Sequence, residues 1–186
     1  MSSDFLCQKL YEGNLRFVRG QSLSRDHVSA RSDLVSGQRP FAGIVTCSDS
    51  RVSPEYLFDV GLGELFVVRN AGNIVDRNTL ASMEYATLHL GVSLIVVLGH
   101  EGCGAVNAAC SSEEYQGNLS LLLGDLHEAV SRGGCDPARV VVENVRLSIE
   151  RLRLGSEHLL SEIERGRLMI RGAIYSLDTG IVRWIN

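Results

Sequence analysis

The sequence predicts an α/β fold, in which a mainly parallel sheet of four strands carries an antiparallel edge strand, is flanked by helices and follows an N-terminal helical arm. Apolar runs rich in β-branched residues occupy 41–46 and 92–99, which is typical of strands buried on both faces. Segments with helical spacing separate the strands, and this alternation indicates parallel pairing through right-handed crossovers. Turn-forming residues at 177–180 predict that the last strand returns antiparallel at an edge.

Residues 1–40 are expected to form the N-terminal helix and arm. Residues 3–19 place leucine and phenylalanine side chains at mostly helical spacing, which indicates an amphipathic helix. Residues 20–40 are polar and nearly free of bulky apolar side chains, so we expect an extended arm or loop. We expect this region to pack on a partner subunit, because a lone chain would expose the apolar face of the helix.

The next elements follow from local signals. The strand at 41–46 leads into a polar loop, after which Ser53 as a cap and Pro54 in the first turn predict the start of a helix. A second strand at 64–68 runs into a turn-prone segment. A helix is then expected over 77–90, with leucine, methionine, alanine and tyrosine side chains available for packing.

The second half of the chain repeats the alternation of strands and helices. The third strand, 92–99, is followed by His100, and a helix is expected to start at Cys103. The remaining expected elements are helices within 119–132, over 137–154 and near 157–165, and strands at 168–176 and 181–186.

Composition limits the classes of function. With 45% hydrophobic and 22% charged residues, the chain fits one domain over residues 1–186 with a core that needs no disulfide bonds. A net charge of −4 and scattered basic residues argue against nucleic acid or an anionic membrane as a partner. We see no signal peptide and no apolar stretch near the roughly 20 residues that span a bilayer, so we expect a cytoplasmic protein. Five cysteines without an export signal favour reduced thiols available to a metal.

Side chains that bind zinc follow the first and third strands where each strand ends. Cys47 and Asp49 are two residues apart and point to the same side of an extended chain, while His100 and Cys103 follow the third strand. Because the carboxyl ends of parallel strands meet at one edge of a sheet, we expect these groups to converge there. Two thiolates favour zinc over magnesium or manganese, so we expect one Zn²⁺ per chain.

Asp49 has two possible roles in this site. It can complete a tetrahedron with Cys47, His100 and Cys103, which closes the site, or it can leave the metal and pair with Arg51. In the open arrangement water takes the vacant position, and zinc lowers the pKa of that water to about 7, giving a hydroxide nucleophile whose hydrogen bond Asp49 accepts. The residues alone leave both arrangements open.

The motifs CSDSR (47–51), RNAGN (69–73), GHEGCG (99–104) and RGAIYSLDTG (171–180) resemble those of the β-class carbonic anhydrases. The match runs in order over about residues 38–180. It implies zinc-dependent, reversible hydration of carbon dioxide to bicarbonate and a proton, with zinc ligands at Cys47, His100 and Cys103. It also implies that Asp49 and Arg51 form the family's catalytic dyad, and that the chain assembles as a homodimer or homotetramer.

The resemblance extends to the substrate pocket of the plant-like subgroup, whose glutamine, phenylalanine and tyrosine match Gln38, Phe66 and Tyr85. The Gln38 amide can donate to an oxygen of carbon dioxide or bicarbonate, and the two aromatic rings can keep the pocket dry. The other subgroup has a tryptophan at the position of Ile44. Arg69 matches the arginine of that subgroup's noncatalytic bicarbonate site, but the missing tryptophan predicts an open, active resting state.

Two other functions fit the same motifs. Related proteins with the same ligands hydrolyse carbon disulfide when access to the pocket is altered. A noncatalytic zinc-stabilised binding protein would keep Asp49 permanently on the metal. Arg51 and Gln38 argue against the noncatalytic alternative, since a purely structural zinc site needs neither.

Overall fold

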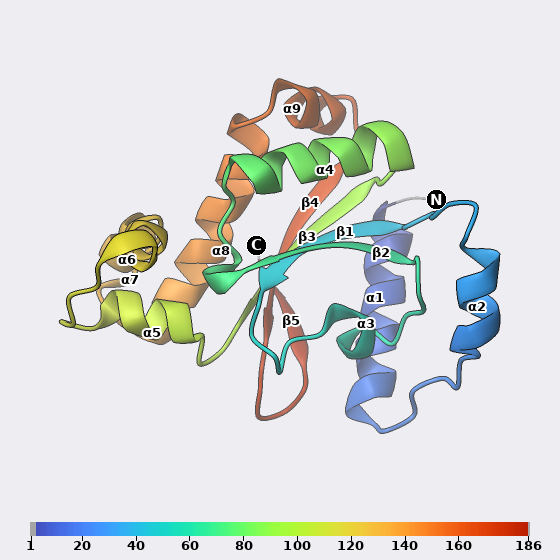
Figure 1. Ribbon diagram of the computed structural model, residues 1–186, viewed down its shortest axis with the longest axis horizontal. Coiled ribbons are helices and arrows are strands. Elements are labelled where there is room, and N and C mark those ends of the chain that lie inside the picture. Colours follow the sequence, from blue (N-terminus) through green and yellow to red (C-terminus); the bar gives the residue numbers. More distant parts are fainter. Residues whose placement is uncertain (1–2, 186) are drawn as a thin grey trace.

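The computed structural model describes residues 3–185, in which a five-stranded sheet lies between two sets of helices (Figure 1). The strand order is β2-β1-β3-β4-β5, with the first four parallel and β5 antiparallel to β4. The strands are β1 (Ala42–Cys47), β2 (Leu65–Asn70), β3 (Leu94–His100), β4 (Met169–Tyr175) and β5 (Val182–Ile185). The predicted fold class and the antiparallel edge strand are confirmed. Asn186, the last residue of the predicted terminal strand, lies outside the described residues.

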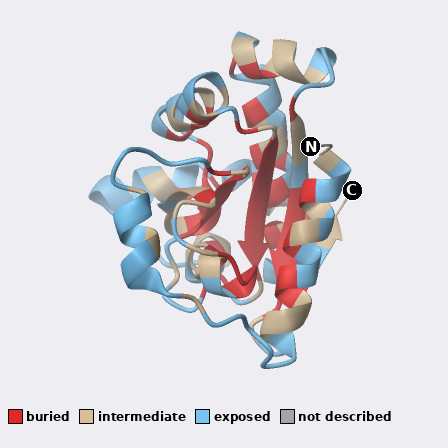
Figure 2. Ribbon diagram, turned by 90° about the vertical axis from the view of Figure 1, so that its right-hand side faces the viewer, coloured by how far each residue is buried: buried red, intermediate tan, exposed pale blue. Residues whose placement is uncertain are grey.

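Successive residues of the central strands enter two different cores, because side chains alternate between the faces of a sheet. Val45 and Val97 pack with the helices α4 (Arg77–Leu90), α5 (Gly104–Cys110), α6 (Gly117–Gly124), α7 (His127–Gly133), α8 (Pro137–Leu154) and α9 (Glu157–Glu164). Ile44 and Val96 pack with α1 (Ser3–Val18) and α3 (Pro54–Leu57) on the other face. Figure 2 shows the strands buried between helices whose outer sides are exposed.

The N-terminal helix α1 packs on the sheet of its own chain. Leu6 and Leu10 are 3% and 0% exposed and belong to the second core. Asn14 is also buried and fixes α1 to the C-terminal hairpin: its Nδ2 donates to the Gly180 carbonyl (2.9 Å), and its Oδ1 accepts from the Val182 N–H (2.9 Å). The apolar face of α1 is therefore covered in part within the chain, while Phe5 and Tyr11 are 55% and 42% exposed, and packing of residues 1–40 on a partner stays a prediction.

The segment expected as an extended arm contains the short helix α2 (His27–Asp33). Asp26 caps this helix by accepting hydrogen bonds from the N–H groups of Val28 (3.0 Å) and Ser29 (3.1 Å). None of its seven residues is buried. The expectation of an extended arm or loop over 20–40 is therefore corrected by one short helix, which has no buried face and so no apolar periodicity that would predict it.

Several boundaries were predicted closely, and others need correction. The helices over 77–90 and 137–154 have the expected bounds. The segment 119–132 holds parts of two helices, α6 and α7, instead of one. Ser53 occupies the cap position of α3, but its side chain makes no capping hydrogen bond. None of the described helices is long and apolar enough to cross a membrane, and the cytoplasmic location stays a prediction.

Candidate metal centre

Cys47, His100 and Cys103 meet at the carboxyl edge of the sheet. Cys47 is the last residue of β1 and His100 the last of β3, and these strands are parallel neighbours. Cys103 stands immediately before α5. One ligand atom from each residue lies within 4.8 Å of the other two, and the sulfur atoms of Cys47 and Cys103 are 4.0 Å apart. All three residues are buried, so the three groups form a compact set of metal donors.

The imidazole of His100 is oriented by a backbone hydrogen bond. Its Nδ1 lies 2.9 Å from the carbonyl oxygen of Glu101. Because a carbonyl only accepts, Nδ1 carries the proton and Nε2 presents a lone pair. Nε2 is fully buried without a hydrogen-bond partner among the described residues. A buried nitrogen of this kind is costly unless it has a partner, and a metal ion at the three donors would supply one.

A hydrogen bond between the sulfur atoms of Cys47 and Cys103 shifts the pKa values of the two thiols in opposite directions. The hydrogen bond from Cys103 lowers the pKa of Cys47, and the same bond raises the pKa of Cys103. The Gly72 N–H also points at the sulfur of Cys47 (3.4 Å) and favours its thiolate form. Gly72 has φ of +77°, and a Cβ atom there would lie 3.3 Å from the Cβ of Ala105, so this close backbone approach requires glycine. The thiolate is the form that binds metal.

Asp49 faces Arg51 in a two-point ion pair. Arg51 donates from Nε to Oδ1 (2.9 Å) and from Nη2 to Oδ2 (2.7 Å), and its N–H donates to Oδ1 (2.9 Å). These hydrogen bonds hold the pKa of Asp49 well below its usual range. Oδ2 is 3.9 Å from Nε2 of His100. The carboxylate therefore borders the three donors while it is paired with the arginine.

The predicted pocket residues lie elsewhere on the chain. Phe66 pairs in register with Gly43, four residues before Cys47, or roughly 13 Å along the strand at about 3.3 Å per residue. Its ring centroid is 6.1 Å from that of Tyr85, which is 48% exposed instead of packed as its helix position predicted. Gln38 is exposed in the arm. The structure brings Phe66 and Tyr85 together at the outer edge of the sheet, and their substrate role stays a prediction.

Contacts of two residues with the metal loops were not anticipated. Arg69 of β2 donates from Nε to the Cys47 carbonyl (3.1 Å) and from Nη2 to the Asp49 carbonyl (2.7 Å). The carbonyl oxygen of Glu101 accepts a hydrogen bond from Nδ1 of His100. A backbone carbonyl is present in every residue, so the sequence did not indicate these contacts, although it placed Arg69 in the RNAGN motif and at the arginine position of the noncatalytic bicarbonate site.

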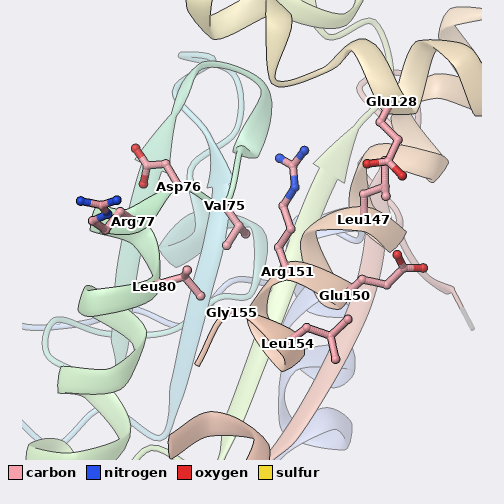
Figure 3. A pocket seen from close by; sticks show the side chains of 10 residues that line it. All are labelled: Val75, Asp76, Arg77, Leu80, Glu128, Leu147, Glu150, Arg151, Leu154 and Gly155. Atoms are coloured by element: carbon pink, nitrogen blue, oxygen red, sulfur yellow. The ribbon is translucent and has the colours of Figure 1, made fainter. Parts of the chain in front are cut away.

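A surface cavity of about 540 Å³ lies apart from these donors, between the start of α4 and the end of α8 (Figure 3). Asp76, Leu80, Arg151 and Leu154 are among its lining residues, and none of the lining residues is a metal donor or a predicted site residue. Arg151 donates from Nη2 to the Asp125 carbonyl (3.1 Å). The cavity is therefore not part of the candidate metal centre.

The α/β sheet carries a Cys₂His donor set at its carboxyl edge, beside an Asp–Arg pair. This combination is typical of a metal-binding α/β protein. The carbonic anhydrase family matches residues 42–182 of this chain. Carbonic anhydrase 2 of Mycobacterium tuberculosis is 43% identical over 189 aligned residues, which cover 92% of this chain and 87% of that protein. The chain belongs to the carbonic anhydrase family, and within it to the β class.

Solved structures agree with this assignment. The β-carbonic anhydrase CcaA superimposes with a TM-score of 0.78 at 32% identity, and the match covers 97% of this chain and 95% of that one. A structure described as one of two tetrameric β-carbonic anhydrases from Sordaria macrospora superimposes with a TM-score of 0.77 at 28% identity, covering 84% and 85%. The similarity thus extends over both the sheet and its flanking helices.

Proposed function

We propose that this protein catalyses the zinc-dependent, reversible hydration of carbon dioxide to bicarbonate and a proton. The observation that carries the proposal is the convergence of Cys47, His100 and Cys103, where Nε2 of His100 is buried without a hydrogen-bond partner among the described residues. Two sulfur donors and one imidazole suit zinc, and a catalytic zinc site has three protein ligands. Zinc bound there would supply a Lewis acid that lowers the pKa of water to about 7.

Asp49 and Arg51 supply the positioning that the reaction needs. The carboxylate is held ionised by the guanidinium, so it accepts a hydrogen bond from a water molecule beside the three donors. That bond fixes one proton of the water and turns a lone pair toward the carbon of carbon dioxide. Arg51 keeps the carboxylate off the donor set, because both carboxylate oxygens are engaged by the arginine.

We further propose that Gln38, Phe66 and Tyr85 line a plant-like substrate pocket, and that this pocket forms between chains. Phe66 and Tyr85 lie on the edge strand β2 and helix α4, at a distance from the metal donors of their own chain. They can therefore serve the metal centre of a neighbouring subunit, in a homodimer or homotetramer. The tetrameric assembly named for the Sordaria macrospora proteins supports this arrangement.

The test is stopped-flow measurement of carbon dioxide hydration by zinc-loaded protein between about pH 6.5 and 9, with zinc content measured on the same sample. Rapid hydration across the range supports an anhydrase with Asp49 paired to Arg51 at rest. Hydration only at the alkaline end would keep the activity but place Asp49 on the metal at lower pH. An inactive, fully loaded protein would contradict the proposal, and turnover of carbon disulfide would then identify the alternative enzyme.

A further inference from the structure

Arg69 makes an unusual pair of contacts beside the metal centre. Its guanidinium donates to the carbonyl oxygens of Cys47 (3.1 Å) and Asp49 (2.7 Å), which flank Ser48 at the start of the loop between β1 and α3. Among the described residues Arg69 forms no ion pair with a carboxylate, although its side chain is exposed. The hydrogen-bonding capacity of the guanidinium is therefore directed at the backbone of this loop.

These contacts fix the backbone from which the Asp49 side chain projects. The Ser48 N–H donates to the Asn70 carbonyl (2.9 Å), so the loop is also attached to the residue that follows Arg69 in β2. The Val52 N–H donates to the Asp49 carbonyl (3.0 Å), on the far side of the dyad. With its carbonyl held from two directions, Asp49 has a fixed Cα–Cβ direction, and that direction brings both carboxylate oxygens to Arg51.

We propose that Arg69 is a positioning residue that holds Asp49 in the pairing with Arg51 and away from the metal. The inference rests on the proposed function. It assigns to Arg69, on the edge strand β2, the control of the open arrangement, in which Asp49 pairs with Arg51 and leaves the metal. Asp49 has two competing partners, Arg51 and the metal, and an interaction made in only one arrangement shifts the population toward it. If Asp49 moves onto the metal by rotation of the loop, the hydrogen bonds from Arg69 to the carbonyls of Cys47 and Asp49 are lost.

The geometry also explains why an arginine is needed. A planar guanidinium presents donors in a fixed fork, whereas a lysine ammonium is a compact point charge on a flexible stem. Arg69→Lys therefore keeps the positive charge but loses the two-point hold on the carbonyls of Cys47 and Asp49. Arg69→Gln removes both the charge and the fork. Comparing the two variants separates loop positioning from simple attraction of anions.

The experiment titrates azide into cobalt-loaded protein at one pH and follows the visible spectrum of the metal. Azide is a small anion that binds only where a coordination position is open, so its apparent affinity falls with the fraction of open sites. We expect azide binding to weaken roughly tenfold in both Arg69→Lys and Arg69→Gln, as expected when charged hydrogen bonds are lost. Arg151→Gln is the matched control, because Arg151 also donates to a backbone carbonyl but lies at the separate cavity.

The outcomes separate the possible explanations. Unchanged azide affinity in Arg69→Gln overturns the inference, and so does weakening in Arg69→Gln that Arg69→Lys fully restores, since charge alone would then account for it. An intact thiolate-to-cobalt charge-transfer band in each variant shows that the donor set is assembled, so a folding defect is recognised. Failure of this inference can be told apart from failure of the proposed function. If the zinc-loaded wild-type protein is inactive, the proposed function fails, but the azide affinities of the cobalt-loaded wild type and variants can still be compared.

Discussion

Arg51 binds Asp49 at both carboxylate oxygens, with Nε 2.9 Å from Oδ1 and Nη2 2.7 Å from Oδ2, although the two residues are only two apart. A pair with this geometry orients the carboxylate as well as keeping it charged. Oδ2 at the same time lies 3.9 Å from the ligand nitrogen of His100. The arrangement places an ionised acceptor beside the metal donors without making it one of them.

The first prediction concerns the catalytic contribution of Asp49. In Asp49→Ala the three donors Cys47, His100 and Cys103 remain, so the variant should keep most of its zinc. Loss of the acceptor that orients water should lower the hydration rate by about 100-fold or more. Zinc content by atomic emission and stopped-flow rates on one sample test this. Full activity in Asp49→Ala would contradict the role of the dyad.

The second prediction concerns the charge of Asp49 as a function of pH. Hydrogen bonds from Arg51 lower the pKa of Asp49. The ion pair therefore contributes its full stabilisation of the folded state above the ordinary carboxyl pKa of about 3.9, and this stabilisation is lost as pH falls through the lowered pKa. The carboxylate should therefore stay ionised from about pH 8 down to pH 4. In Arg51→Met its pKa should rise toward the ordinary range. Titration of ¹³C-labelled aspartate by NMR measures the pKa of Asp49 in the wild type and in Arg51→Met. The same pKa in both proteins would show that hydrogen bonds from Arg51 do not cause the shift.

The metal donors were predictable because Cys47 and His100 end strands with strong apolar patterning and Cys103 follows three residues after His100. Cys47 and His100 follow runs that enter both cores, and parallel pairing brings their ends together. The helix α2 was missed because it buries no side chain. The hydrogen bonds of Arg69 were missed because their acceptors are carbonyl groups, which every residue has. The distance of Phe66 from Cys47 follows from strand register, which only the structure provides.

The third prediction separates metal-binding cysteines from ordinary ones. Cys47→Ala and His100→Ala should each lose zinc and activity together, because each removes one of three donors and exposes no substitute. Cys135→Ala is the control: Cys135 is exposed and is not among the converging donors. It should retain wild-type zinc content and rate. Zinc retained at full stoichiometry in His100→Ala would show that the donor set is wrongly assigned.

The fourth prediction concerns the proposed pocket. Gln38 is exposed and has no part in the metal centre of its own chain, so Gln38→Ala should keep full zinc content. If its amide donates to the substrate in the assembled protein, the variant should lose about tenfold in kcat/KM, equivalent to one hydrogen bond. Gln21→Ala, which changes another exposed glutamine of the same arm, is the control. An unchanged rate in Gln38→Ala would remove this residue from the site.

The fifth prediction concerns Asp59, a buried carboxylate that anchors the arm to α3. Arg16 and Arg25 donate to its oxygens at 2.5 and 2.6 Å, and the Leu23 N–H adds a bond of 3.2 Å. Burial raises the pKa of Asp59, but these hydrogen bonds outweigh burial, and the net pKa is lowered. Asp59→Ala removes the acceptor of these charged hydrogen bonds and leaves Arg16 and Arg25, which are partly exposed, without their partner, so it should lower the free energy of unfolding by about 2 kcal/mol.

The control for Asp59→Ala is Glu128→Ala, which breaks an exposed pair with Arg132 and should change stability by less than about 0.5 kcal/mol. Urea unfolding of the zinc-loaded proteins measures both. Because the pKa of Asp59 is lowered in the folded state, its stabilising contribution is present above about pH 4 and disappears as pH falls through the lowered value. The difference between wild type and Asp59→Ala should therefore shrink in acid. Equal losses in the two variants at neutral pH would show that the buried cluster adds no more than a surface pair.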